Sequence, residues 1–127
     1  LAGEMGLEKS VCVLPGRVDR ATTLDWYQAL DVFCVPRLDT PVCRLVTPLK
    51  PMTAMALGRP VVASDLPALR EITAPSANRS FPAGDVEALS RVLTQLAAGA
   101  PLPSTRQTLP TWSSNAVRQA EIYAGLV

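Results

Sequence analysis

The stretch that decides the fold is "PLKPMTAMALGRPVVASDLPALREI", residues 48–72. At its centre, residues 60–64 form a short apolar run that is typical of a buried strand. A helix is expected before this run, beginning at Pro51, because the first helical position has no use for a backbone N–H. Gly58 can end that helix in the left-handed conformation. After the strand, Pro67 can start another short helix, so the stretch predicts a helix–strand–helix unit.

The same alternation of strands and helices extends to both sides. We expect further strands over residues 11–16, 31–36 and 79–81, and further helices over residues 22–30, 85–98 and 111–126. The first of these helices carries a capping signal, because Thr22 is followed three residues later by Asp25. Residues 37–49 have two prolines, mixed charge and no clear period, which predicts a loop. Buried strands that alternate with helices favour a doubly wound, Rossmann-like parallel sheet of the α/β class.

The domain organisation follows from the same pattern. Residues 1–99 are expected to form the α/β unit, and residues 100–127 a Pro-rich linker and a C-terminal helix. This last segment either packs on the sheet or reaches toward a neighbouring domain. The opening "LAGEMGLEKS" has no initiator Met and reads as the tail of a helix, so the chain is expected to begin partway through a fold.

Charge and hydropathy exclude two classes of protein. The net charge is +1 and the lysines and arginines form no block, whereas a nucleic-acid surface shows a basic patch or stripe. No apolar run approaches the roughly 20 residues of a membrane-spanning helix. We therefore expect neither a nucleic-acid partner nor a transmembrane segment.

Residue types exclude several chemistries. The chain has no histidine, which removes Ser-His-Asp catalysis, Cys-His catalysis and His-ligated zinc. It holds no G-x-G-x-x-G fingerprint and no P-loop, so we expect no nicotinamide or flavin cofactor and no P-loop nucleotide. The three cysteines, Cys12, Cys34 and Cys43, are widely spaced and odd in number. They are interpreted as reduced core thiols rather than as a disulfide framework or a metal site.

One segment is a candidate anion site. In doubly wound folds ligands bind beyond the carboxyl ends of the strands, and the long segment over residues 36–51 leaves a strand there and ends at a helix start. Free N–H groups and the positive end of the helix dipole favour anions at such a start, and Lys50 adds a full charge. The hypothesis is a seat for a phosphate or diphosphate, and the alternative is a solvated lysine. Arg17, Arg20 and Arg37 are likewise either phosphate ligands or loop charges.

The motifs resemble those of a known enzyme family. Residues 48–72 are similar to PLKP-x-EAMA-x-G-x-PVVASD-x-PALRE, the signature of family-4 glycosyltransferases. "VLPGRV" and "WYQALDVFCVPR" resemble the turn, Tyr-containing helix and Asp-Val strand that precede the signature. "FPAGDVEALSRVLTQL" and "TWSSNAVRQAEIYAGL" resemble the two helices that follow it. The resemblance covers nearly the whole chain, with the motifs in the family's order.

This resemblance implies the C-terminal, donor-binding half of a GT-B enzyme of carbohydrate biosynthesis. The partner would be a nucleotide-diphospho-sugar, transfer would retain the anomeric configuration, and no metal or other cofactor would be needed. The protein would be cytoplasmic or peripheral at the membrane. Carried over by position, the residues that line the diphosphate would be Leu49, Lys50 and Pro51, and those that contact the nucleobase through their backbone would be Gly16, Arg17 and Val18. No catalytic residue is assigned.

The departures from the family pattern open a second hypothesis. The family has Glu at the position of Thr53, where it binds both ribose hydroxyls, and an earlier Glu at the position of Leu45. The opening strand and helix of the donor domain also have no counterpart, so an upstream domain or a second chain is expected to complete the sheet. The chain is therefore either a donor-binding fragment that is inactive alone or a degenerate, non-catalytic interaction module. Replacing Thr53 by Glu distinguishes the two.

Overall fold

The computed structural model describes residues 2–13, 16–73, 79–101 and 110–126. At its centre lies a parallel three-stranded sheet of order β1–β2–β3. Phe33 of β1 pairs with Val61 of β2, and Ser64 of β2 pairs with Phe81 of β3. The strands are β1 (Phe33–Val35), β2 (Val61–Ser64) and β3 (Arg79–Phe81). The helices are α1 (Arg20–Ala29), α2 (Pro41–Leu45), α3 (Leu49–Ala56), α4 (Pro67–Thr73), α5 (Val86–Ala97) and α6 (Trp112–Ala124).

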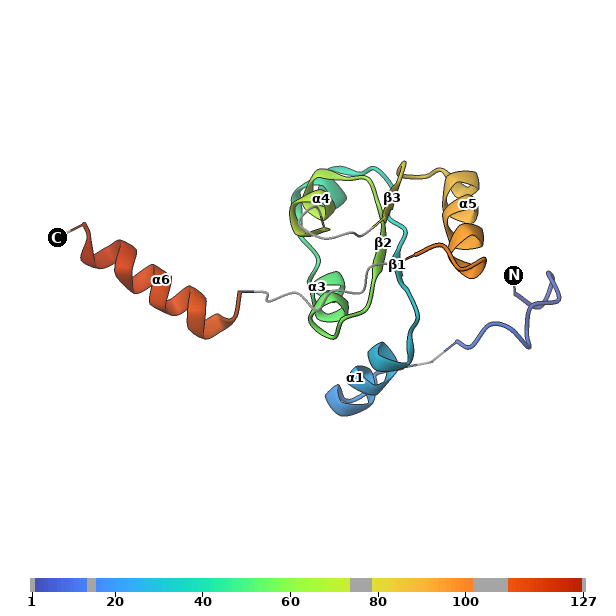
Figure 1. The fold of residues 1–127 in the computed structure, drawn as a ribbon, viewed down its shortest axis with the longest axis horizontal. Coiled ribbons are helices and arrows are strands. Elements are labelled where there is room, and N and C mark those ends of the chain that lie inside the picture. Colours follow the sequence, from blue (N-terminus) through green and yellow to red (C-terminus); the bar gives the residue numbers. More distant parts are fainter. Residues whose placement is uncertain (1, 14–15, 74–78, 102–109, 127) are drawn as a thin grey trace.

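Helices cover both faces of this sheet, with α3 and α4 on one side and α5 on the other (Figure 1). Successive strand residues point to opposite faces. Val61 and Ala63 therefore pack with residues of α3 and α4 in one core cluster, while Val62 packs with Phe81 and α5 in the other. All four residues of β2 are buried. The predicted doubly wound parallel sheet is confirmed.

Local signals in the sequence explain where α3 ends and where α5 begins. Gly58 follows α3 with a φ of 74°, the left-handed conformation that a glycine adopts at no steric cost. Asp85 caps α5, because its side chain accepts a hydrogen bond from the Ala88 N–H at 2.7 Å. The strands expected over residues 31–36, 60–64 and 79–81 and the helix expected over residues 85–98 are therefore present, within one or two residues of their predicted bounds.

The cap of α1 differs from the prediction. The helix expected to begin at Thr22 begins at Arg20, and Asp19 is its N-cap. The Asp19 carboxylate accepts hydrogen bonds from the Thr22 N–H at 3.0 Å and from the Thr22 hydroxyl at 2.6 Å. An ionised carboxylate is a stronger acceptor than a hydroxyl, so Thr22 donates where it was expected to accept.

The segment expected to be a loop over residues 37–49 contains α2. Thr40 is the N-cap, with its side-chain oxygen accepting from the Cys43 N–H at 3.3 Å, and Pro41 occupies the first helical position. Helix α3 also begins earlier than expected, at Leu49, which puts Pro51 in the third position rather than the first. Proline is accepted there because the third N–H of a helix also has no intrahelical partner.

The strand expected over residues 11–16 is not formed by those of its residues that the structure describes. Residues 11–13 are exposed and belong to no strand, and residues 14 and 15 lie outside the described part of the chain. Cys12, interpreted from the sequence as a buried thiol, is exposed as well. An extended segment becomes a buried strand only where a neighbour pairs with it, and within the described residues β1 pairs with β2 alone.

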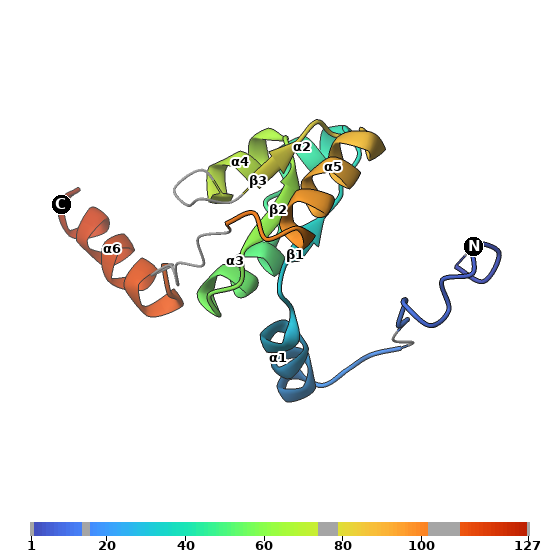
Figure 2. The ribbon, with the colours of Figure 1, turned by 45° about the vertical axis from the view of Figure 1, so that its right-hand side comes forward.

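Helix α6 stands apart from the sheet. The two ribbon views agree on this separation (Figures 1 and 2). The helix expected over residues 111–126 is present, but none of its residues is buried, and the side chain of Trp112 is 90% exposed. Residues 102–109 of the predicted linker lie outside the described part of the chain.

Candidate functional site

The start of α3 presents two backbone donors that have no partner within the helix. The N-cap residue, Pro48, makes no side-chain hydrogen bond to the helix. The first four N–H groups of a helix lack an intrahelical partner, but the prolines at positions 48 and 51 carry no N–H. Leu49 and Lys50 supply the two N–H groups that remain, and both residues are exposed. The helix start therefore presents two N–H groups beside the Lys50 ammonium.

The third residue predicted to line the diphosphate lies below the surface. Pro51 is fully buried together with Ala54 and Met55, on the side of α3 that packs against the sheet. Its ring fixes the first turn of the helix rather than lining a surface site. The ammonium and the two N–H groups are thus held by a helix whose inner side is anchored in the core.

Thr53 uses its hydroxyl within its own helix. The side-chain oxygen lies 3.4 Å from the Leu49 carbonyl oxygen, to which the hydroxyl donates. This back-bond to the preceding turn is common for threonine in helices. Leu45, at the position where the family has its earlier Glu, is 82% exposed. No carboxylate therefore stands at either position.

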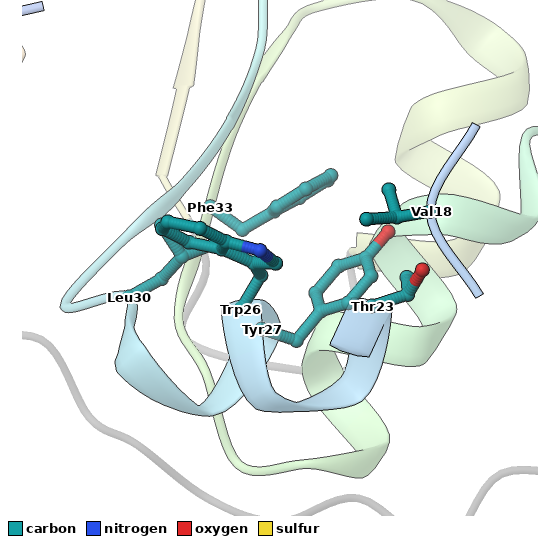
Figure 3. Close-up of a pocket in the computed structure, with 6 residues that line it drawn as sticks. All are labelled: Val18, Thr23, Trp26, Tyr27, Leu30 and Phe33. Atoms are coloured by element: carbon teal, nitrogen blue, oxygen red, sulfur yellow. The ribbon is translucent and has the colours of Figure 1, made fainter. Parts of the chain in front are cut away.

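The residues predicted to contact the nucleobase lie near α1. Gly16, Arg17 and Val18 are exposed, and Gly16 has a φ of 86°. Val18 lines an apolar cavity of about 260 Å³. The remaining lining residues come from α1, from its C-cap and from the first position of β1, and they are Thr23, Trp26, Tyr27, Leu30 and Phe33. Figure 3 shows the Tyr27 hydroxyl directed toward Val18, and the Tyr27 and Phe33 rings are 5.2 Å apart.

Val18 and Leu49, one from each predicted group of residues, line different cavities. The cavity beside Val18 lies at Phe33, the amino end of β1, and neither Leu49 nor Lys50 lines it. Leu49 instead lines a separate cavity of about 430 Å³, together with Met52 of α3 and residues at the start of α6. The residues predicted to contact the nucleobase and those predicted to line the diphosphate therefore belong to two separate surface regions.

Two ion pairs follow the carboxyl ends of β1 and β2. Arg44 pairs with Asp39, and Arg70 pairs with Asp65. The hydrogen bond from each guanidinium lowers the pKa of the partner carboxyl, with charge attraction adding to it. All four side chains lie at the surface, where such pairs contribute little to stability. Their cations are already engaged by carboxylates.

The buried residue Ser64 lies at the same edge of the sheet and is hydrogen-bonded to Arg37. This residue is only 1% exposed. Its hydroxyl oxygen accepts a hydrogen bond from the Arg37 N–H at 2.7 Å, and the hydroxyl donates to the Arg37 carbonyl at 2.8 Å. Sequence reasoning missed this contact. A serine that ends an otherwise apolar strand was the available signal, because a buried hydroxyl must find a partner.

The described residues were also compared with the requirements of a metal site, a membrane-spanning helix and a disulfide. Within the described ranges, no group of three or more Cys, Asp or Glu side chains could hold a metal ion. No helix in the part of the chain that the structure describes is both long and apolar enough to span a bilayer. All three thiols are free, and burial raises the pKa of Cys34. Cys34 and Cys43, which were expected to lie in the core, are only half-buried.

The parallel sheet with helices on both faces defines a Rossmann-like α/β domain. A family model described as "Glycosyl transferases group 1" matches residues 1–98, which include every element from α1 to α5. The chain belongs to this family, and its sheet is a Rossmann-like fragment of a GT-B glycosyltransferase. A search among curated proteins gives no match.

Proposed function

We propose that this chain is the donor-binding domain of a retaining glycosyltransferase. In this proposal it binds a nucleotide-diphospho-sugar and transfers no sugar on its own. The observation that carries the proposal is the uncapped, exposed start of α3 beside Lys50, in a member of the group 1 glycosyltransferase family.

The chemistry of this helix start suits a diphosphate. The dipole places roughly half a positive charge at the N-terminus of a helix, and the N–H groups of Leu49 and Lys50 point along it. Hydrogen bonds to charged groups contribute about 1.5–3 kcal/mol each. Two such bonds together with an ammonium can hold a diphosphate without a metal ion, and the proposal invokes none.

The nucleobase would contact residues 16–18. These residues are exposed, which leaves their backbone accessible, and the space beside Gly16 is open because a Cβ there would meet nothing within 4 Å. In the cavities described above this segment and α3 are separate, so the proposal has them contact different parts of the donor. A further strand beside β1 would fix the position of this segment relative to α3.

Completion of the sheet is therefore part of the proposal. Within the described residues β1 has a strand neighbour on one side only, and residues 11–13 are an exposed apolar run without one. Unpaired N–H and C=O groups are unfavourable once water is excluded from them. We expect an upstream domain or a second chain to supply the missing neighbours, and the acceptor side of the enzyme to come from outside residues 1–127.

The test is a calorimetric titration of the 127-residue chain with uridine, guanosine and adenosine diphosphate sugars. One of them is expected to bind, and Lys50→Ala is expected to weaken that binding about tenfold or more, through loss of a charged contact. Lys9→Ala is the matched control, because Lys9 is the chain's other lysine and is exposed. Equal losses in both variants, or no binding by the folded wild type, would contradict the proposal.

The second candidate is a non-catalytic interaction module that no longer binds a donor. The occupied hydroxyl of Thr53 and the exposed Leu45 favour it, because the carboxylates that the family uses for the ribose are absent. Thr53→Glu separates the candidates. A donor-binding domain is expected to gain about tenfold in affinity from a new charged acceptor. An interaction module is expected to show no donor binding with either residue.

The proposal places the protein in the cytoplasm, or peripherally at a membrane, in carbohydrate biosynthesis. Free thiols persist in a reducing compartment, and the exposed Cys12 is unpaired in this structure. A disulfide-linked form isolated from cells under conditions that block thiol exchange would contradict the cytoplasmic assignment.

A further inference from the structure

The apolar run at residues 11–13 is exposed in the single chain. Val11 is 44% exposed and Val13 is 76% exposed, and Cys12 is exposed as well. In both ribbon views residues 2–13, drawn in dark blue, lead away from the sheet (Figures 1 and 2). The run does not line the apolar cavity beside α1, although Val18 does. The chain therefore carries an apolar run that its own fold leaves uncovered.

The open side of β1 offers space for such a run. Within the described residues β1 pairs with β2 alone. The cavity of about 260 Å³ lies at Phe33, the first residue of β1, and its lining is almost entirely apolar (Figure 3). Helix α1, which forms its other wall, has no buried residue, and Trp26 is 44% exposed. Covering this apolar surface is favourable, because burial removes it from water.

The run and the strand match in length and in alternation. Each is three residues long. Phe33 and Val35 pack against the core cluster on the side of α3 and α4, whereas Cys34 packs against the cluster on the side of α5. Directly opposed residues of paired strands point to the same face. If the middle residue of the run lies next to Cys34, its two valines therefore lie on the face of Phe33 and the cavity.

Surface area and charge favour a partner of the same kind. The accessible surface of the chain is 9341 Å², whereas about 6,500 Å² is expected for a folded monomer of 13.5 kDa. Specific interfaces bury about 1,200–2,000 Å² in total, so the excess is large enough for one. The net charge is only +1, which puts little repulsion between two copies.

We propose that two copies of this chain form a dimer by exchanging residues 11–13. Each copy lays its run beside β1 of the other, so the interface is self-complementary and closes with two-fold symmetry. A second copy fits because one chain carries both the exposed run and the cavity that accepts it. The inference rests on the part of the proposed function that expects a neighbour for β1, and it names that neighbour.

Sedimentation equilibrium of the full 127-residue chain tests whether the dimer forms. The wild type is expected to pass from monomer to dimer in roughly the micromolar range, the weak end for interfaces of this size. Val13→Asp is expected to raise the dissociation constant about tenfold or more, because the dimer would bury an unpaired carboxylate. The single chain exposes this position, so the dilute monomer is expected to stay folded.

The matched control is Val117→Asp, which places the same charge at an exposed valine of α6. Its dissociation constant is expected to stay within about twofold of wild type, as for an ordinary surface substitution. Circular dichroism confirms that both variants are folded. Equal weakening by the two substitutions would show that residues 11–13 are not the interface and would refute the inference.

A mixing experiment tests whether the run passes from one copy to the other. One chain carries Cys34→Ala with Cys43→Ala, and the second carries Cys12→Ala with Cys43→Ala, so each keeps a single thiol. Opposed strand residues have Cα atoms about 4.5–5.5 Å apart, which a disulfide can bridge. Diamide takes up the two protons and two electrons that a pair of thiols releases. The mixture is expected to give a dimer linked between Cys12 and Cys34, identified by peptide mass spectrometry.

The remaining outcomes separate the dimer from its alternatives. A chain that stays monomeric at every concentration refutes the inference. So does a Cys43→Ala chain in which Cys12 and Cys34 become linked within one monomer, because the run then closes on its own β1. A monomer that still binds a nucleotide-diphospho-sugar refutes the dimer and leaves donor binding intact. A dimer that binds no nucleotide-diphospho-sugar refutes donor binding alone.

Discussion

Two short apolar runs in this chain have opposite structures. Residues 61–64 form β2, and every one of them is buried between strand neighbours on both sides and helices on both faces. Residues 11–13, "VCV", are also apolar, yet they are exposed and form no strand. Both runs are short and rich in valine, and the structural difference between them lies in their neighbours. A buried parallel strand depends on partners that its own sequence does not contain.

The largest effect is expected from placing a charge in each run. Val62→Asp puts a carboxylate at a position that is 0% exposed, and an unpaired buried charge is among the few changes that lower stability by more than about 4 kcal/mol. Val13→Asp, at a side chain that is 76% exposed, is expected to change stability by less than about 0.5 kcal/mol. Urea denaturation followed by circular dichroism measures both. Similar losses would mean that residues 11–13 are buried in solution.

An intermediate effect is expected at the end of β2. Ser64→Ala removes the hydroxyl that satisfies the Arg37 N–H and carbonyl, and unsatisfied buried polar groups cost about 1–3 kcal/mol. Ser80→Ala on the neighbouring strand is the control, because Ser80 is exposed and a small change is expected there. The same denaturation curves give both values. A loss for Ser64→Ala no greater than that for Ser80→Ala would show that these two hydrogen bonds contribute nothing.

The smallest effect is expected from the surface ion pairs. The hydrogen bond from Arg70 lowers the pKa of Asp65 in the folded chain. A lowered folded pKa gives stability that is present above the unfolded pKa, about 3.9 for Asp, and that is lost as the pH falls through the folded value. Arg70→Ala should move the Asp65 pKa upward toward the unperturbed value of about 3.9, which an NMR titration of the carboxyl carbon over the acidic pH range measures. An unchanged pKa would mean that the pair is not formed in solution.

Local chemistry allowed much of the sheet and its helices to be predicted. The Gly58 signal bounded α3 because a positive φ acts within a few residues. The same locality could have revealed α2, whose Thr40 cap and Pro41 start are an ordinary helix signal. It was missed because prolines and mixed charge over residues 37–49 were interpreted as a loop.

Long-range contacts set the limit of that prediction. The hydrogen bonds between Ser64 and Arg37 join residues 27 positions apart, and no local pattern specifies them. The exposed state of residues 11–13 is of the same kind, since it depends on what lies beside β1. For the candidate site, Lys50 at a helix start could be predicted from helix geometry alone. The distance between that helix and residues 16–18 could not, because it depends on how the edge of the sheet is completed.

The central claim is that the start of α3 binds a diphosphate, and amide chemical shifts test it most directly. Proton–nitrogen NMR spectra of the labelled chain would be recorded during titration with uridine, guanosine and adenosine diphosphates. The account predicts that the Leu49 and Lys50 amide signals shift most, and that Lys50→Ala abolishes the shift at the same nucleotide concentration. Saturable binding that leaves these two amides unmoved and shifts signals elsewhere would contradict it.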